Sequence, residues 1–204
     1  VTQFTYLGSD VDSDGYSTPE MHRRLGIANS AMGQLDRIWR QRKLSLHTKL
    51  RIYSSLVLSV LLYGSETWTL RKTDSARLQA FHMTSQRRIL GIKWQDHITN
   101  NAIKAKTGLM DLPTMVADRR HALFGHICRL PPDTPAHQAL SLCIDVSTGT
   151  RPAADWKRPP GRPRRTWLQQ LEEDLGQKVD VIRTAALDRS IWRSLRPSAG
   201  LAQQ

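Results

Sequence analysis

The run Leu61-Leu62-Tyr63-Gly64-Ser65-Glu66-Thr67-Trp68 decides how this chain divides into helices. It closes a mostly apolar segment, residues 56–63, and then reaches a glycine, the residue that most often ends a helix. A helix that is apolar on most sides has to be buried. We therefore expect a helix over residues 45–63 to form the centre of the core. Trp68 should fill the corner before the next helix begins.

Upstream of this run the sequence predicts a short strand and an amphipathic helix. Residues 3–7 are rich in β-forming side chains, and residues 9–15 are crowded with Asp, Ser and Gly, as a turn is. Ser17 and Glu20 have the spacing of a capping box at the start of a helix. The apolar positions of residues 21–39 then step by four and three residues, which indicates one face of an α-helix.

Downstream the pattern is again helical. A helix should run from about Asp74 to Leu90, because Leu78, Phe81, Ser85 and Ile89 share one face and Gly91 follows as a stop signal. Further helical patterns cover residues 100–107, 115–129, 134–143, 165–176 and 180–195. The predicted fold class is therefore mainly α: a helical bundle with a short N-terminal β-strand or hairpin.

Glycine and proline mark a linker near the C-terminal end of the chain. Residues 144–165 contain Gly149, Gly161 and four prolines, which favour a flexible, extended segment over helix. The predicted organisation is an N-terminal strand and turn (1–16), a helical domain (17–143), this basic linker (144–165) and a helical C-terminal tail (166–204).

Charge points to a polyanionic partner. The 204 residues carry a net charge of +12, with a pI near 10.4, and nucleic acid is the commonest partner of such a chain. The charge is uneven, since residues 1–20 hold four acids and no Lys or Arg. Two windows are strongly basic: residues 37–51 have six Lys or Arg and no acid, and residues 151–165 have six against one Asp.

Cysteine content and hydropathy limit the cellular location. Cys128 and Cys143 are the only cysteines, and the sequence starts without a signal-peptide pattern, so we expect reduced thiols in the nucleus or cytoplasm and no secretion. The longest apolar run is too short to span a membrane. The sequence opens at Val1 and not at Met, from which we expect a fragment or a degraded reading frame.

The residues of catalytic and metal sites are present only in incomplete patterns. Asp10-x-Asp12-x-Asp14-Gly15 resembles the start of a calcium loop, but Met21 stands where the bidentate Glu belongs. Nucleophile elbows, phosphate loops and dinucleotide fingerprints are absent from the sequence. A zinc set lacks the close ligand pairs that structural zinc sites use; its members would be His121, His126, Cys128, His137 and Cys143. We therefore expect no catalytic residue, no metal and no cofactor.

Cations interleaved with aromatic residues are the remaining functional signal. The first group surrounds Trp39 at a helix–helix turn, where phosphate contact competes with a simpler role in neutralising helix C-termini. The second group flanks Trp94, and the third lies in the linker. The predicted nucleic-acid contacts are Arg37, Arg40, Arg42, Lys43, Lys49 and Arg51; Arg87, Arg88 and Lys93; and Lys157, Arg158, Arg162, Arg164 and Arg165.

Within the linker, Gly161-Arg162-Pro163 resembles the core of an AT-hook, which places arginines in a narrow A·T minor groove. Pro160 stands where the first arginine of a hook belongs, so sequence-neutral phosphate binding is the alternative. The tryptophans of the helical segments, Trp39, Trp167 and Trp192, have core-like spacing; we expect them to pack, with base stacking as the alternative.

Several motifs in one order carry a family resemblance. They include Tyr6-Leu7-Gly8-Ser9, the run from Tyr63 to Trp68, residues 90–96, Gly125-His126 and the run from Gly161 to Trp167. With these motifs the chain resembles the C-terminal part of a non-LTR (LINE-like) retrotransposon endonuclease/reverse transcriptase polyprotein. The resemblance covers nearly the whole chain.

This resemblance implies the end of a polymerase palm over residues 1–16, a helical thumb over 17–92 and a C-terminal extension. The parent polyprotein would be an RNA-directed DNA polymerase, but its aromatic-x-Asp-Asp string is absent from this sequence. The implied function is therefore non-catalytic binding of an RNA–DNA hybrid or duplex DNA, with the catalytic half of a reverse transcriptase as a further partner. The alternatives are an AT-hook-like DNA-binding module centred on 157–165, a helical protein–protein interaction domain, or an inactive relic.

Overall fold

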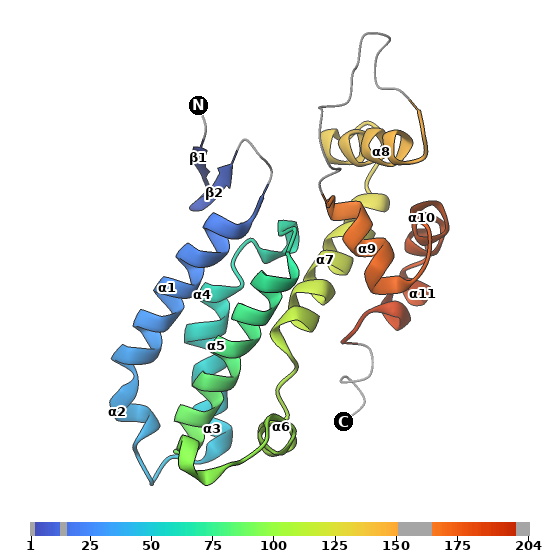
Figure 1. Cartoon of the computed structure of the whole chain (residues 1–204). Coiled ribbons are helices and arrows are strands. Elements are labelled where there is room, and N and C mark those ends of the chain that lie inside the picture. The colour runs from blue at the N-terminus through green and yellow to red at the C-terminus, as the bar shows by residue number, and fades with distance from the viewer. Residues whose placement is uncertain (1–2, 13–15, 151–164, 199–204) are drawn as a thin grey trace. The chain divides into compact units, whose positions relative to one another are not determined.

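The structure, a computed structural model, describes residues 3–12, 16–150 and 165–198 and is mainly helical, with one two-stranded antiparallel sheet (Figure 1). This confirms the predicted fold class. The chain forms two compact units, Val1–Val116 (unit 1) and Ala117–Gln204 (unit 2). The predicted segments 1–16, 17–143, 144–165 and 166–204 stay a prediction.

The N-terminal segment is a tight hairpin. Strands β1 (Gln3–Tyr6) and β2 (Ser9–Asp12) pair antiparallel with Tyr6 opposite Ser9. The two residues between them, Leu7 and Gly8, both have positive φ, 47° and 74°. That is the backbone a two-residue hairpin loop needs. The turn therefore lies at residues 7–8, and residues 9–12, which were expected to form a turn, are the second strand.

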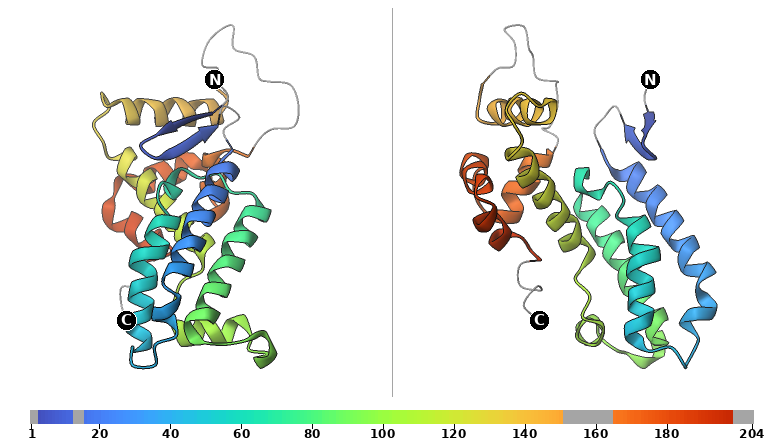
Figure 2. Two further views of the ribbon diagram at one scale, coloured as in Figure 1. Left: turned by 90° about the vertical axis from the view of Figure 1, so that its left-hand side faces the viewer. Right: turned by 180° about the vertical axis from the view of Figure 1, so that it is seen from behind.

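Helices make up the rest of unit 1. Helix α1 packs against both α4 and α5, and the three lie side by side in Figure 2. The helices of the unit are α1 (Thr18–Gln34), α2 (Asp36–Trp39), α3 (Leu46–Ile52), α4 (Ser59–Leu61), α5 (Lys72–Leu90), α6 (Asn100–Thr107) and the first turn of α7 (Leu112–Cys128).

The core of unit 1 follows the predicted periodicity. Met21, Ala28 and Met32 of α1 are buried, and so is Trp39 of α2. They share one apolar cluster with residues of the central helix and of α5. Trp68 belongs to the same cluster and is 1% exposed, which confirms that it fills a corner of the core.

The central helix is less regular than predicted. A π-helical segment, Tyr53–Leu58, links α3 to α4, so the 46–61 stretch widens in its middle. Leu56 is 51% exposed although it lies in the most apolar run, and Tyr63 is also exposed. The expectation that this run is buried on most sides is therefore wrong at these two positions. Gly64 does end the segment, in the left-handed region at φ 70°.

The predicted capping box at Ser17 is also wrong. The Ser17 side chain does not cap α1; its Oγ accepts a hydrogen bond from the Thr69 backbone N–H at 3.0 Å. The Glu20 carboxylate is held by two arginines of α1, Arg23 Nε at 2.7 Å and Arg24 Nε at 2.8 Å. A charge-assisted pair outcompetes a neutral cap for the carboxylate.

Unit 2 packs α7 against four shorter elements. These are α8 (Pro135–Ser147), α9 (Trp167–Leu175), α10 (Val179–Leu187) and α11 (Arg189–Leu195). The predicted single helix over 180–195 is two helices, because the Asp188 carboxylate caps α11 by accepting the backbone N–H groups of Ser190 (2.7 Å) and Ile191 (3.1 Å). The start of the predicted linker, as far as Ser147, is helical.

Candidate nucleic-acid interface

Two basic regions that lie fifty residues apart in the sequence meet at one end of unit 1. Asp36, the first residue of α2, accepts hydrogen bonds from Arg88 in the last turn of α5, from Nε at 3.0 Å and from Nη2 at 2.7 Å. Figure 1 shows α2, the start of α3 and the end of α5 at the same end of the unit. The first two predicted groups of cations therefore form one surface.

The loop that follows α5 is held at the same end. Gly91 ends α5 in the left-handed region at φ 68°, and the chain turns back. Arg87 Nη2 then donates to the carbonyl of Ile98 at 2.8 Å and to Asn100 Oδ1 at 3.0 Å. Two adjacent arginines, Arg87 and Arg88, thus anchor the 92–98 loop and α2 on one helix end.

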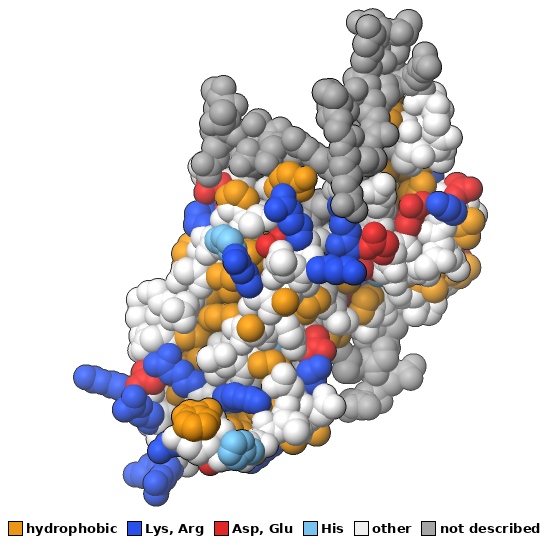
Figure 3. All heavy atoms as spheres, in the orientation of Figure 1, with side chains coloured by type: hydrophobic (Ala, Val, Ile, Leu, Met, Phe, Trp, Pro, Cys, Tyr) orange, Lys and Arg blue, Asp and Glu red, His pale blue; other side chains and the backbone are white. Residues whose placement is uncertain are grey.

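We call this surface the basic end of unit 1. In the stretches 36–52 and 86–98 the carboxylates are Asp36 and Asp96 alone. Figure 3 shows Lys and Arg side chains gathered over this end, with hydrophobic and His surface among them. The cations of the basic end are Arg37, Arg40, Arg42, Lys43, Lys49, Arg51, Arg87, Arg88 and Lys93.

Four of these cations have structural partners. Besides Arg87 and Arg88, Arg40 pairs with Asp36 at 2.7 Å, and Lys49 Nζ donates to the Trp39 carbonyl at 2.7 Å. The hydrogen bond from Arg88 is the main cause that lowers the pKa of Asp36, and Arg40 adds to it. Arg40 is nevertheless 81% exposed, so it can still reach a ligand.

The other five cations have no side-chain hydrogen bond or ion pair within the described residues. All five are exposed. They are Arg37, Arg42, Lys43, Arg51 and Lys93. A cluster of unneutralised cations is a surface that favours a polyanion.

The two tryptophans near this surface differ in their burial. Trp39 is buried and its Nε1 donates to the Met32 carbonyl at 3.0 Å, which confirms packing. Trp94, in the loop after α5, is 78% exposed. In the sequence Trp94 is a neighbour of cations, and its position between the helix-ending Gly91 and the next helix is the local signal of a surface position.

The structure describes one of the five predicted linker cations. Lys157, Arg158, Arg162 and Arg164 lie outside the described residues. Arg165 is described, and it forms an ion pair with Glu173 of α9. The AT-hook-like reading of 157–165 therefore stays a prediction. Trp192 is buried as expected, and Trp167 is partly buried against the core of unit 2.

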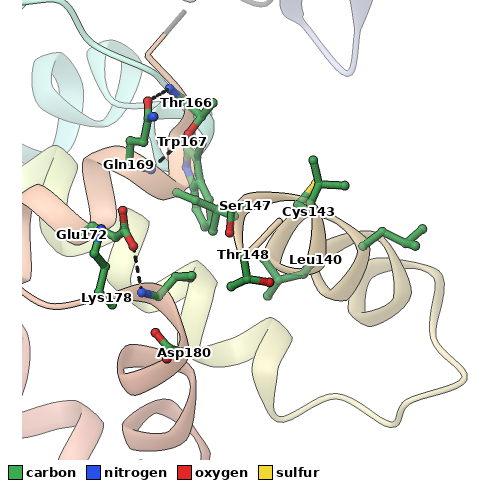
Figure 4. A pocket seen from close by; sticks show the side chains of 14 residues that line it. Leu140, Cys143, Ser147, Thr148, Thr166, Trp167, Gln169, Glu172, Lys178 and Asp180 are labelled. Carbon is green, nitrogen blue, oxygen red and sulfur yellow. Dashed lines mark hydrogen bonds between the residues drawn. The ribbon is translucent and has the colours of Figure 1, made fainter. Parts of the chain in front are cut away.

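Unit 2 holds a pocket of about 990 Å³ between α8, α9 and α10 (Figure 4). Its wall is mostly apolar, and its hydrogen-bonded polar groups serve the helix ends. Gln169 Oε1 accepts the Thr166 N–H at 2.9 Å, and Glu172 Oε1 accepts the Val179 N–H at 2.9 Å. The lining includes one cation, Lys178, and two carboxylates, Glu172 and Asp180, so the pocket does not suit a polyanion.

The described residues contain no group of three His, Cys, Asp or Glu side chains that could hold a metal ion. Cys128 is buried, and burial raises the pKa of its thiol to about 11, whereas Cys143 is exposed. Asp10, in β2, forms an ion pair with Arg23 Nε at 3.2 Å. Among the helices of the described residues, none is both long enough and apolar enough to cross a membrane.

Comparison with known proteins finds one matching domain model and a distant relative. Residues 31–63 match a domain of unknown function (DUF6451), a span that contains the six cations from Arg37 to Arg51. The chain is 26% identical, over 206 residues, to an uncharacterized transposon-derived protein of Caenorhabditis elegans; the match covers 94% of this chain and 69% of that protein. No solved structure matches the chain. The chain is thus distantly homologous to a transposon-derived protein.

Proposed function

We propose that the chain is a non-catalytic nucleic-acid-binding part of a reverse transcriptase of the LINE-like kind, and that the basic end of unit 1 contacts the phosphate backbone of an RNA–DNA hybrid or duplex DNA. The observation that carries the proposal is the convergence of α2, the start of α3 and the end of α5. It gathers nine cations against two carboxylates.

The simpler explanation, neutralisation of helix C-termini, does not account for this surface. That explanation fits Lys49, which donates to the Trp39 carbonyl at the end of α2. It also fits Arg87 and Arg88, which lie in the last turn of α5. Arg42 and Lys43 lie between α2 and α3, outside both helices, and form no side-chain hydrogen bond or ion pair within the described residues. Like charges held together without counter-charges cost folding energy, and phosphate binding offsets that cost by releasing counterions.

The homology supports the proposal at a coarser level. A transposon-derived relative is consistent with a protein that handles nucleic acid. The palm, thumb and reverse-transcriptase assignments rest on the motifs from Tyr6 to Ser9 and from Tyr63 to Trp68. The absence of catalysis rests on the missing aromatic-x-Asp-Asp string. The catalytic half of the enzyme would be the second partner.

The test is a charge variant compared with a matched control. Arg37→Gln/Arg42→Gln/Lys43→Gln removes three unpaired cations of the basic end, and Lys72→Gln/Lys178→Gln/Arg189→Gln removes three exposed cations elsewhere. Binding of the full chain to fluorescent duplex DNA and to an RNA–DNA hybrid is measured by anisotropy.

At about 0.1 M salt, each duplex phosphate contact contributes nearly tenfold to affinity through counterion release. The first variant should therefore lose on the order of a hundredfold or more, and the control should lose far less. Equal losses in the two variants would show that only net charge matters, and the basic end would not be a site. Wild-type affinity in both variants, with tight binding to an acidic protein, would favour the protein-interaction alternative.

A further inference from the structure

Trp94 is an aromatic side chain placed where packing does not explain it. It is 78% exposed, while Trp39, Trp68 and Trp192 are at most 3% exposed. An indole left in water forgoes the favourable burial of a large apolar area. Single exposed apolar residues are common, so the surroundings of Trp94 decide its role.

The backbone that carries Trp94 is held in place. Trp94 opens a 3₁₀ turn, Trp94–Asp96, and the Asp96 carboxylate accepts the Lys93 N–H at 2.7 Å. His97, which follows the turn, has a positive φ of 48°, an uncommon conformation for a residue other than glycine. The hydrogen bond from Arg87 to the Ile98 carbonyl holds the C-terminal end of this loop on α5.

The Trp94 ring is open to solvent on a cationic surface. His97 meets the indole edge-on, with ring centroids 6.5 Å apart and planes at 84°, so it does not stack over the indole. Lys93 precedes Trp94, and Arg87 anchors the loop. An apolar protein partner would have to bury these cations, whereas a nucleic acid brings a flat aromatic base together with phosphate.

We propose that Trp94 stacks on an unpaired nucleobase next to the phosphates held by the basic end of unit 1. This inference rests on the proposed function and deepens it, because it names the form of nucleic acid. A base inside a duplex has neighbours on both of its faces and offers none to Trp94. The site therefore prefers a single strand, or the unpaired end of a duplex, to an uninterrupted double helix.

The experiment compares two probes and two substitutions in the full chain. The probes are fluorescein-labelled thymidine 15-mer, which has unpaired bases throughout, and a 40-base-pair duplex. Trp94→Ala removes the stacking surface, and Trp94→Phe keeps an aromatic face. Because Trp94 is exposed, neither change should alter the thermal melt, which is checked by circular dichroism.

Trp94→Ala should weaken 15-mer binding about five- to hundredfold and change duplex binding by less than about twofold. Trp94→Phe should restore most of the loss. Trp156 directly precedes the linker cations, so its emission could also respond to nucleic acid, and it is replaced by Phe. In this Trp156→Phe background, the 15-mer should quench tryptophan emission, and Trp94→Phe should abolish that quenching.

Two results would overturn the inference while the proposed function stands: unchanged 15-mer binding by Trp94→Ala, or an equal loss on both probes. If the proposed function is wrong, the result is different: the affinity for both probes would be unchanged in Arg37→Gln/Arg42→Gln/Lys43→Gln. No binding of either probe at low salt overturns both.

Discussion

Gly125 of α7 is the position where one added methyl group should damage unit 2 most clearly. A Cβ at this position would lie 2.1 Å from Nε1, 2.3 Å from Cδ1 and 2.9 Å from Cε2 of Trp192. Non-bonded heavy atoms approach favourably to about 3.5 Å, so the indole would have to move by more than about 1 Å in Gly125→Ala. Trp192 is 2% exposed and packs against Phe124, so it has little room to move.

The magnitude follows from three contributions. Overpacking of a close-packed core costs about 1–3 kcal/mol. Displacing the indole also breaks the buried hydrogen bond from Trp192 Nε1 to the His121 carbonyl (2.8 Å), which costs about 1–3 kcal/mol more. Alanine offsets about 1 kcal/mol because it is the better helix former. We expect Gly125→Ala to lower the free energy of unfolding by about 3 kcal/mol.

The assay is urea denaturation followed by circular dichroism, with hydrogen exchange to locate the change in α7 and α11. The matched control is Gly26→Ala in α1, where a Cβ would meet nothing within 4 Å; it should be neutral or stabilising by up to about 1 kcal/mol. In a Trp192→Leu background, the penalty of Gly125→Ala should largely disappear. If Gly125→Ala is as stable as wild type, the packing of α11 on α7 is not as described.

Two further predictions concern unit 1. Buried His82 accepts from the Tyr53 hydroxyl at Nδ1 (2.9 Å) and donates from Nε2 to the Met110 carbonyl (3.2 Å), and burial lowers its pKa from 6.5 to about 4. Between these pH values the unfolded chain binds a proton that the folded chain does not. Stability should therefore fall by up to roughly 3 kcal/mol as the pH drops from 6.5 to 4. Urea titrations at several pH values measure this fall. If the free energy of unfolding of His82→Leu falls with pH as steeply as that of the wild type, the prediction is wrong. Glu20→Gln should leave the buried Arg24 guanidinium without its carboxylate and cost about 3 kcal/mol. Thermal denaturation measures this loss, and Asp36→Asn is the control because the Asp36 carboxylate makes exposed ion pairs. Equal losses of stability in the two variants would argue against a buried ion cluster at Glu20.

Helices and their ends could largely be predicted from sequence because their signals are local. The periodicity from Met21 to Trp39 and the glycine stops at Gly64 and Gly91 act within one or two turns. The errors arose where one carboxylate had more than one local partner to choose from. Glu20 was expected to cap α1 and binds arginines instead. Asp188 caps a new helix inside a run that is amphipathic throughout.

The candidate site could be predicted only in part. The sequence identified the cation groups at residues 37–51 and 87–93, but their convergence depends on the Asp36–Arg88 pair, which joins residues 52 positions apart. The helical spacing of Trp39 predicts its burial, whereas the place of Trp94 after the helix-ending Gly91 is only a weak local signal of exposure. The loop that carries Trp94 is held by hydrogen bonds from Arg87 of α5 to Ile98 and Asn100, which no local pattern in the sequence reveals.

The most direct test of the nucleic-acid proposal counts phosphate contacts. Binding of the full chain to duplex DNA is measured across a salt series, and the slope of log affinity against log salt is compared between wild type and Arg37→Gln/Arg42→Gln/Lys43→Gln. Each phosphate contact adds about 0.9 to the slope, so five contacts at the basic end give about −4.5. Loss of three contacts should make the slope shallower by about 2.7, whatever other cations of the chain contribute. An unchanged slope, in a variant shown to be folded, would contradict the proposal that the basic end of unit 1 holds the phosphate backbone.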